Sequence, residues 1–370
     1  MTKPGMQMDR YAPFREIARS NDLDAVALVP GPNFHRLYGK NFHTNERPLV
    51  IMIPAEGVPA AVVPNLELGS FALIDFEGAV FDWRDQDGYA AAFDALGAVM
   101  PLGRVGVEGQ IMRVFVHHAL RAGMPGVELV DAERAISGLR LRKTPEEIAA
   151  MERAIAVSEA ALARTVADVR VGMTEVEVER LLTRELFAAG AEDFAFHPIV
   201  AAGDNSARPH AKARAEYAIR TGDALLIDFG ARVDGLCSDV TRTFFVGEPS
   251  DEAREVYAAV LAANMAGHAA TRPGATAHDV DDAVISVLEA SPFADRIRTK
   301  TGHGLGRDVH EEPYIMRGNF QVLEPGMVFT NEPGLYRLGA FGVRIEDDVL
   351  VTEGGARSLT SFPKELTVIG

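Results

Sequence analysis

Residues 221–228 read TGDALLID, and residues 324–332 read EPGMVFTNE. Each segment has a glycine followed by a short apolar run that ends in a carboxylate, a pattern typical of a buried strand. The two segments align without a gap, pairing Gly222 with Gly326 and Asp228 with Glu332. This correspondence predicts that one half of a domain is repeated in the other half.

A second pair of segments lies upstream at nearly the same offset. TEVE (174–177) corresponds to TAHD (276–279), and each places an acid three positions after a threonine, ahead of an apolar helical run. That spacing is the signature of a capped helix start. A period of this length is too long for a solenoid. We therefore predict an internally duplicated domain with pseudo-two-fold symmetry.

The overall composition is that of an ordinary globular protein. At 370 residues the chain exceeds the usual size of one hydrophobic core, so two domains are expected. A formal net charge of −16 argues against nucleic acid or an anionic membrane surface as a partner. Cys237 is the only cysteine, which excludes an intrachain disulfide and a cysteine-rich zinc site.

The N-terminal segment MTKPGMQMDRYAPF lacks the apolar region of a secretory signal. The longest apolar run, residues 48–64, is interrupted by prolines and a glycine and is not expected to span a membrane. Together these features predict a reduced, cytoplasmic protein with no membrane partner.

The first third of the chain alternates helix and strand signals, which predicts a smaller α/β domain over residues 1–138. His117 and His118 fall within one of its helices without an acidic neighbour, so we interpret them as structural. The expected elements are helices at 11–20, 88–99 and 112–123, strands at 24–29 and 104–109, and a hairpin within 47–64.

A second domain is expected over residues 139–370. Thr144, Pro145 and Glu147 form a capping box with proline at the first helical position. Apolar residues then follow at helical spacing, and predict one long amphipathic helix at the start of this domain; they are Ile148, Met151, Ile155, Leu162 and Val166.

The duplicated domain carries four acids in apolar surroundings. Asp228 and Asp239 come from consecutive strands of the first half, and Glu332 and Glu346 from the second. A buried carboxylate costs several kcal/mol unless it is paired, protonated or bound to a cation. Because the halves are related by symmetry, all four acids are expected to converge. His303, in the loop after the strand-like segment 297–302, adds a nitrogen donor.

Four carboxylates and one imidazole suit two divalent ions better than one. Considered alone, each of these residues could have a purely structural role, because an acid at a strand end is commonly a turn or cap residue. The glycines of GHGLGRDVHEEP (302–313) do not follow the GxGxxG order inside a βαβ unit, so this segment is not interpreted as a phosphate loop.

Taken together, these motifs resemble metallopeptidase family M24, which includes methionine aminopeptidase, aminopeptidase P and prolidase and has the pita-bread fold. The resemblance rests on Asp228, on Asp239 eleven residues later, and on the segments 302–313, 323–336 and 342–353. The segment FHPIVAAGDNSARPHA (196–211) is similar to the family's segment that carries its first catalytic histidine. The first 138 residues look like a creatinase/prolidase N-terminal domain.

The resemblance implies a dinuclear metal site. Its ligands would be Asp228, Asp239, His303, Glu332 and Glu346. Asp239 and Glu346 would bridge the ions, and Glu332 would also act as general base beside a bridging hydroxide nucleophile. An oxygen-rich site suits manganese, with cobalt, iron or zinc as alternatives.

The resemblance also implies a substrate site. His210 and His310 would flank the scissile carbonyl as catalytic and substrate-binding residues. Arg344, two residues from Glu346, would pair with a ligand acid at the substrate site. Tyr314 occupies the position where some prolidases carry an arginine for the carboxylate of a dipeptide. Cys237 is expected to pack rather than to react.

The implied activity is hydrolysis of Xaa-Pro bonds in short peptides by a homodimer. Tyr314 favours an aminopeptidase P-like or broader action over a dipeptidase. One alternative is a small-molecule enzyme on the same fold, such as an ectoine-type hydrolase or a sulfonium-compound lyase. Creatinase is disfavoured because it lacks the metal ligands. The other alternative is a non-catalytic pita-bread binding protein.

Overall fold

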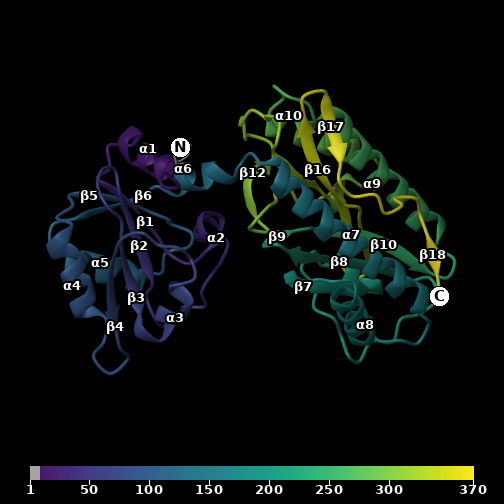
Figure 1. Cartoon of the computed structure of the whole chain (residues 1–370). Helices are drawn as coiled ribbons and strands as arrows, with labels where there is room; N and C mark the ends of the chain where they lie inside the picture. Colours follow the sequence, from purple (N-terminus) through teal and green to yellow (C-terminus); the bar gives the residue numbers. More distant parts are fainter. Residues whose placement is uncertain (1–8) are drawn as a thin grey trace, which may run out of the picture. The chain divides into compact units, whose positions relative to one another are not determined.

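The computed structural model describes residues 9–370. The chain divides into two compact units, one ending at Arg140 and one beginning at Leu141 (Figure 1). The expected boundary between residues 138 and 139 stays a prediction. Residues 1–8, the first part of the segment that lacks the apolar region of a secretory signal, lie outside the described residues. Within 9–370, the helices are too short or too polar to cross a membrane.

The N-terminal unit is a six-stranded sheet in the order β4-β3-β2-β1-β5-β6, with helices on both faces. Its helices and the β2–β3 hairpin confirm the elements expected from the sequence. The helices are α1 (Ala12–Ser20), α2 (Pro32–Tyr38), α3 (Leu68–Phe71), α4 (Ala90–Val99), α5 (Val114–Gly123) and α6 (Glu133–Ser137). The strands are β1 (Ala25–Leu28), β2 (Val50–Pro54), β3 (Ala60–Pro64), β4 (Ala79–Trp83), β5 (Arg104–Val107) and β6 (Glu128–Asp131).

The central strands of this sheet are apolar throughout because both faces are covered. In β1, Ala25 and Ala27 pack toward α4 and α5. The alternate residues Val26 and Leu28 pack toward α1, α2, α3 and α6. The same alternation continues in β2 and β3, so two separate cores sandwich one sheet.

One fully buried acid, Glu108, lies at the end of β5 in this unit. Its carboxyl accepts hydrogen bonds from the Val29 backbone N–H and from Asn33 Nδ2, both at 3.0 Å. Arg140 Nε in turn donates to Asn33 Oδ1 at 2.8 Å. Burial raises the pKa of Glu108 to about 7.

This raised pKa predicts a pH-dependent stability of the N-terminal unit. A carboxyl with a raised folded-state pKa stabilises the fold below its unfolded pKa, and the contribution is lost as pH rises through the folded value. Between pH 5 and 8 the wild type should lose up to about 3 kcal/mol from this group, and Glu108→Gln should show a flatter profile. Equal slopes for both proteins would contradict the prediction. Denaturant unfolding followed by Trp83 fluorescence reports on this unit, because Trp83 is the only tryptophan.

The C-terminal unit has two five-stranded sheets and a two-stranded ribbon, β14-β15. One sheet runs β18-β10-β8-β7, with β9 paired to β8, and the other runs β12-β11-β13-β16-β17. The helices are α7 (Pro145–Asp168), α8 (Glu175–Ala188), α9 (Asp251–Ala270) and α10 (Ala277–Glu289). The strands are β7 (Asp193–Ala202), β8 (Ala224–Val233), β9 (Leu236–Cys237), β10 (Val240–Val246), β11 (Gly302–Gly304), β12 (Glu311–Ile315), β13 (Val328–Asn331), β14 (Gly334–Arg337), β15 (Phe341–Arg344), β16 (Asp347–Thr352), β17 (Gly355–Ser358) and β18 (Val368–Ile369).

The predicted duplication is visible in the order of the strands. The run β10-β8-β7 in one sheet corresponds to β16-β13-β11 in the other. Each half also has a pair of helices, α7 with α8 and α9 with α10, packed against its strands. The capping threonines Thr174 and Thr276 both form capping boxes, and each also bridges to the segment before the matching strand, at Ala218 and Val322.

The capping box predicted at Thr144 is confirmed. The Thr144 hydroxyl accepts from the Glu147 N–H at 3.2 Å, and the long helix α7 begins there.

The prediction of a strand over residues 297–302 is wrong. Those residues follow a 3₁₀ turn, and the strand itself begins only at Gly302, with pairing to β12 and β13. His303 therefore lies within a strand rather than in a loop.

Candidate metal centre

The five predicted ligands come from corresponding places in the two halves. Asp228 lies within β8, and Asp239 immediately precedes β10. Glu332 immediately follows β13, and Glu346 immediately precedes β16. His303 is the central residue of β11. All five side chains line one pocket of about 500 Å³ within the C-terminal unit, so the structure brings the whole predicted set together.

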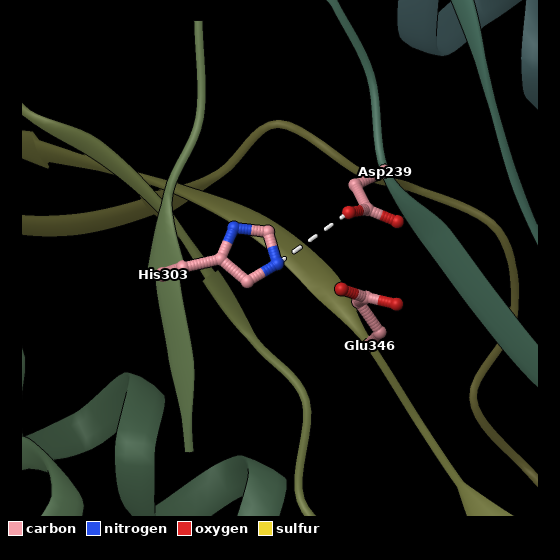
Figure 2. Close-up of side chains that lie close together, drawn as sticks. All are labelled: Asp239, His303 and Glu346. Carbon is pink, nitrogen blue, oxygen red and sulfur yellow. Dashed lines mark ion pairs between the residues drawn. The ribbon is translucent and has the colours of Figure 1, made fainter. Parts of the chain in front are cut away.

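His303 lies close to three of the predicted acids. Its Nε2 is 3.4 Å from Glu332 Oε1 and 3.7 Å from Asp239 Oδ2. Ligand atoms of Asp239, His303 and Glu346 all lie within 4.8 Å of one another (Figure 2). These side chains point toward a common centre, as metal ligands do.

The protonation state of His303 suits a metal ligand. Its Nδ1 lies 3.1 Å from the Gly304 carbonyl oxygen, which can only accept, so Nδ1 carries the proton. Burial and then the neighbouring His310 lower the pKa of His303 to about 3. The ring is therefore neutral, and Nε2 presents its lone pair to the acids.

The carboxylates destabilise one another's charge. Burial, and then Glu346 and Asp228, raise the pKa of Asp239 well above its usual range. Burial, and then Glu332 and Asp228, do the same to the pKa of Glu346. Burial raises the pKa of Glu332 to about 7. A bound divalent cation would replace the protons that these groups otherwise retain.

Two buried oxygens in the group have no partner. Asp228 Oδ1 and Asp239 Oδ1 are shielded from solvent and accept no hydrogen bond among the described residues. Buried carboxylate oxygens are rarely left unsatisfied unless an ion or water belongs there. The unpartnered oxygens, the mutual repulsion and the oxygen-rich donor set therefore fit divalent metal ions.

Arg344 holds one of the candidate ligands in place. Its guanidinium pairs with Asp228 rather than with its near neighbour Glu346. Arg344 Nη1 donates to Tyr336 Oη at 2.9 Å, and Nε donates to Thr241 Oγ1 at 3.1 Å. These three contacts fix the side chain, so Arg344 acts on the site mainly through Asp228.

Thr241 is a site residue that the sequence analysis missed. Its hydroxyl accepts from Arg344 and donates to Glu346, and so links two groups of the pocket. The signal was present, because Thr241 in β10 lies two residues after Asp239, and extended backbone places such residues on the same face. A strand period of two would have identified it.

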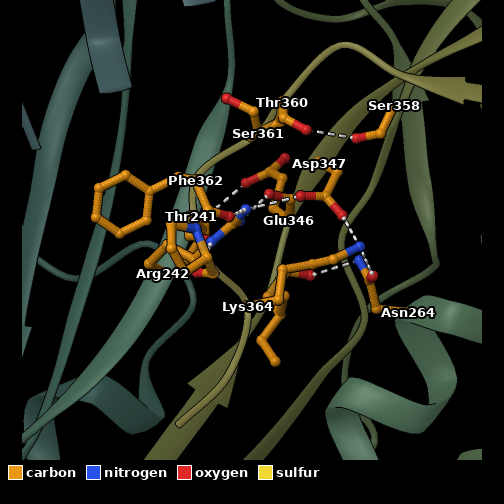
Figure 3. A network of polar contacts seen from close by, with 12 residues as sticks. Thr241, Arg242, Asn264, Glu346, Asp347, Ser358, Thr360, Ser361, Phe362 and Lys364 are labelled. Atoms are coloured by element: carbon orange, nitrogen blue, oxygen red, sulfur yellow. Dashed lines mark hydrogen bonds and ion pairs between the residues drawn. The ribbon is translucent and has the colours of Figure 1, made fainter. Parts of the chain in front are cut away.

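Only one of the three consecutive acids in IEDD reaches the pocket. Asp347 receives Arg242 Nη2 at 2.8 Å and Lys364 Nζ at 2.7 Å (Figure 3). Asp348 accepts from the Asp239 backbone N–H at 3.1 Å. Arg242 also donates to the carbonyl oxygens of Phe362 and Pro363, which ties the C-terminal segment to the strand that follows Glu346.

The other predicted residues have different placements. His210 and His310 both line the pocket, and the rings of His303 and His310 are 4.0 Å apart between centroids. Tyr314 is absent from the residues that line the described pocket, but Lys300, which lines it, lies over the Tyr314 ring. Cys237 is buried in an apolar cluster, which confirms the packing role.

Comparison with known proteins agrees with this geometry. Residues 149–353 match Metallopeptidase family M24, and residues 10–142 match the Creatinase/Prolidase N-terminal domain. A probable dipeptidase PepE of Mycobacterium bovis is 36% identical over 94% of this chain and 92% of its own length.

Two solved structures are similar over nearly the whole chain. A prolidase from Thermococcus sibiricus has a TM-score of 0.93 at 34% identity, covering 98% of this chain and 100% of the other. An Xaa-Pro dipeptidase from Bacillus anthracis has a TM-score of 0.89 at 29% identity, covering 98% and 99%. The fold, the convergent acids and the family match agree: this chain belongs to metallopeptidase family M24 and carries a creatinase/prolidase-type N-terminal domain.

Proposed function

We propose that this metallopeptidase hydrolyses Xaa-Pro peptide bonds and releases the N-terminal residue. The observation that carries the proposal is a single pocket that gathers five carboxylates, among them the four candidate ligand acids, and three histidines from both halves of the duplicated domain. The names of the similar proteins, which include a dipeptidase, a prolidase and an Xaa-Pro dipeptidase, support the same substrate class.

In this proposal Asp228, Asp239, His303, Glu332 and Glu346, which all line the pocket, would hold two divalent ions, and Asp239 and Glu346 would contribute to both. When bound, such ions lower the pKa of a water molecule toward neutrality and polarise the substrate carbonyl. Arg344 and Thr241 keep Asp228 and Glu346 in place through the contacts described above.

The protein's own residues supply the proton transfers and the orientation of the substrate. Glu332, whose carboxylate lies 3.4 Å from His303 Nε2 in the pocket, would take a proton from the attacking water and return it to the leaving nitrogen. Shielding of its ring, and then Lys300, lower the pKa of His310. A neutral imidazole there can donate one N–H to the carbonyl oxygen, and His210 can donate from the same pocket.

The pocket also contains apolar surface for a proline ring. Its apolar lining residues are Phe196, Ile199, Pro209 and Val309. A proline ring has no amide N–H to satisfy, so an apolar wall without a hydrogen-bond acceptor accommodates it.

The remaining parts of the proposal extend the family resemblance. Manganese suits the oxygen-rich donor set, with cobalt, iron or zinc as alternatives that metal analysis of the isolated protein would distinguish. The protein is proposed to be a cytoplasmic homodimer. Its catalytic domain would be residues 139–370 and its N-terminal domain residues 1–138. Sedimentation and cell fractionation would test the assembly and the location.

The proposal predicts a metal-dependent and proline-specific activity. Chelator-treated protein should regain activity with Mn²⁺ or Co²⁺ on Ala-Pro or Ala-Pro-Ala, and should prefer them to Ala-Ala by at least about 10-fold. Release of free alanine would be measured for each substrate. Metal binding without cleavage of any proline peptide would overturn the peptidase proposal and favour a small osmolyte as substrate. Absence of bound metal would favour a binding protein.

A further inference from the structure

Two permanent cations, Arg344 and Lys300, line the described pocket. Arg344 is occupied by Asp228, Tyr336 and Thr241. Lys300 is exposed, and within residues 9–370 no carboxylate lies within ion-pairing distance of its ammonium group. One cation of the pocket therefore remains available to a ligand.

The position of Lys300 is defined by its neighbours. It lies three residues before His303, at the start of the segment that becomes β11. Its Nζ is 5.4 Å from the centre of the Tyr314 ring, close enough for a cation–π contact. Tyr314 carries no charge, so its contribution is to hold the ammonium at the pocket wall.

A second polar group beside Lys300 also lacks a partner. The hydroxyl of Thr299, which lines the same pocket, is shielded from solvent and makes no hydrogen bond among the described residues. A buried hydroxyl without a partner is uncommon in a folded protein. The ammonium and the hydroxyl together form a place for an anionic group with more than one oxygen.

Binding of a dipeptide requires a site for its C-terminal carboxylate. Five acids line the pocket, and they repel a negatively charged ligand. In a dipeptide the free carboxylate belongs to the residue directly after the scissile bond, whereas a tripeptide has a neutral peptide group there. A cation near the reacting groups therefore favours the dipeptide. Lys300 lines the same pocket as His310 and Glu332, so its ammonium group lies on the wall of the site where the substrate would be cleaved.

We propose that Lys300 binds the C-terminal carboxylate of the substrate, assisted by the Thr299 hydroxyl, and so makes this enzyme prefer dipeptides. The inference rests on the proposed Xaa-Pro hydrolysis and deepens it by naming the substrate length. It reverses the expectation drawn from Tyr314, because the positive charge comes from a neighbouring segment instead of from that position.

The test compares three substrates of the manganese-loaded enzyme: Ala-Pro, its C-terminal amide, and Ala-Pro-Ala. The wild type should have its highest kcat/KM on the free acid. Lys300→Met should lower kcat/KM on the acid by about 10- to 100-fold and change the amide by less than about 3-fold. Lys300→Arg should retain most of the preference. Arg254→Met, which removes an exposed cation that does not line the pocket, is the matched control.

The outcomes separate this proposal from the one on which it rests. Equal loss on acid and amide would show that Lys300 acts on structure or on the reacting groups, and would overturn carboxylate binding. A wild type that cleaves the amide or the tripeptide as well as the acid would also overturn it, while Xaa-Pro hydrolysis would stand. A wild type that cleaves none of the three would refute the proposed function itself.

Discussion

Replacing Glu346 by alanine is expected to remove metal and activity together. The Glu346 side chain is buried, and its carboxylate lies close to Asp239 and His303, where both proposed ions would share it. Loss of a shared ligand should weaken metal affinity by at least about 100-fold and kcat/KM by at least about 10³-fold. Metal analysis after gel filtration would measure the bound ions, and an Ala-Pro assay the activity.

The metal-free variant should nevertheless remain folded. Glu346 is one of the groups that raise the pKa of Asp239, so its removal relieves repulsion among the remaining acids. Glu353, an exposed glutamate that immediately follows β16, provides the matched control, and Glu353→Ala should keep its metal. If Glu346→Ala retained two ions per chain, its assignment as a shared ligand would be wrong.

The duplication made much of the fold predictable from the sequence. TGDALLID and EPGMVFTNE became the equivalent strands β8 and β13, and the two capped helices occupy equivalent places beside them. Such patterns are local, since they depend on apolar spacing and on a threonine with an acid three residues later. Symmetry then brings the acids together, although no single acid predicts its partners.

The choice of partners was harder to predict. Nothing in the order Arg344, Ile345, Glu346 shows that the guanidinium pairs with Asp228 across the sheet. Lys300 gave no signal either, because its importance depends on the Tyr314 ring beside it. Contacts of this kind form between strands that are far apart in the sequence. A sequence pattern predicts only the structure of residues that are close to one another along the chain.

The segment IEDD illustrates the same limit. Successive side chains of an extended chain point to opposite faces, so the side chains of Glu346 and Asp347 were expected to have different surroundings. Which of them faces the pocket depends on Arg242 and Lys364, which bind Asp347 on the other face. The family resemblance identified Glu346, and the two cations that bind Asp347 give the physical reason.

His310→Ala is expected to separate catalysis from metal binding. His310 lines the pocket, and its ring contacts that of His303. The family resemblance places it at the substrate and not among the five candidate metal ligands. The variant should therefore keep near-normal metal content while kcat falls by at least about 10²-fold, because a hydrogen-bond donor to the developing oxyanion is lost.

The measurement that checks this is kcat on Ala-Pro alongside the metal content of the same preparation. His197→Ala, an exposed histidine of the same unit that pairs with Glu179, is the matched control and should behave like the wild type. A His310→Ala protein with full activity would refute the catalytic role. A protein that lost both metal and activity would place His310 among the metal ligands, because the contact with His303 would then be part of the metal site rather than of the substrate site.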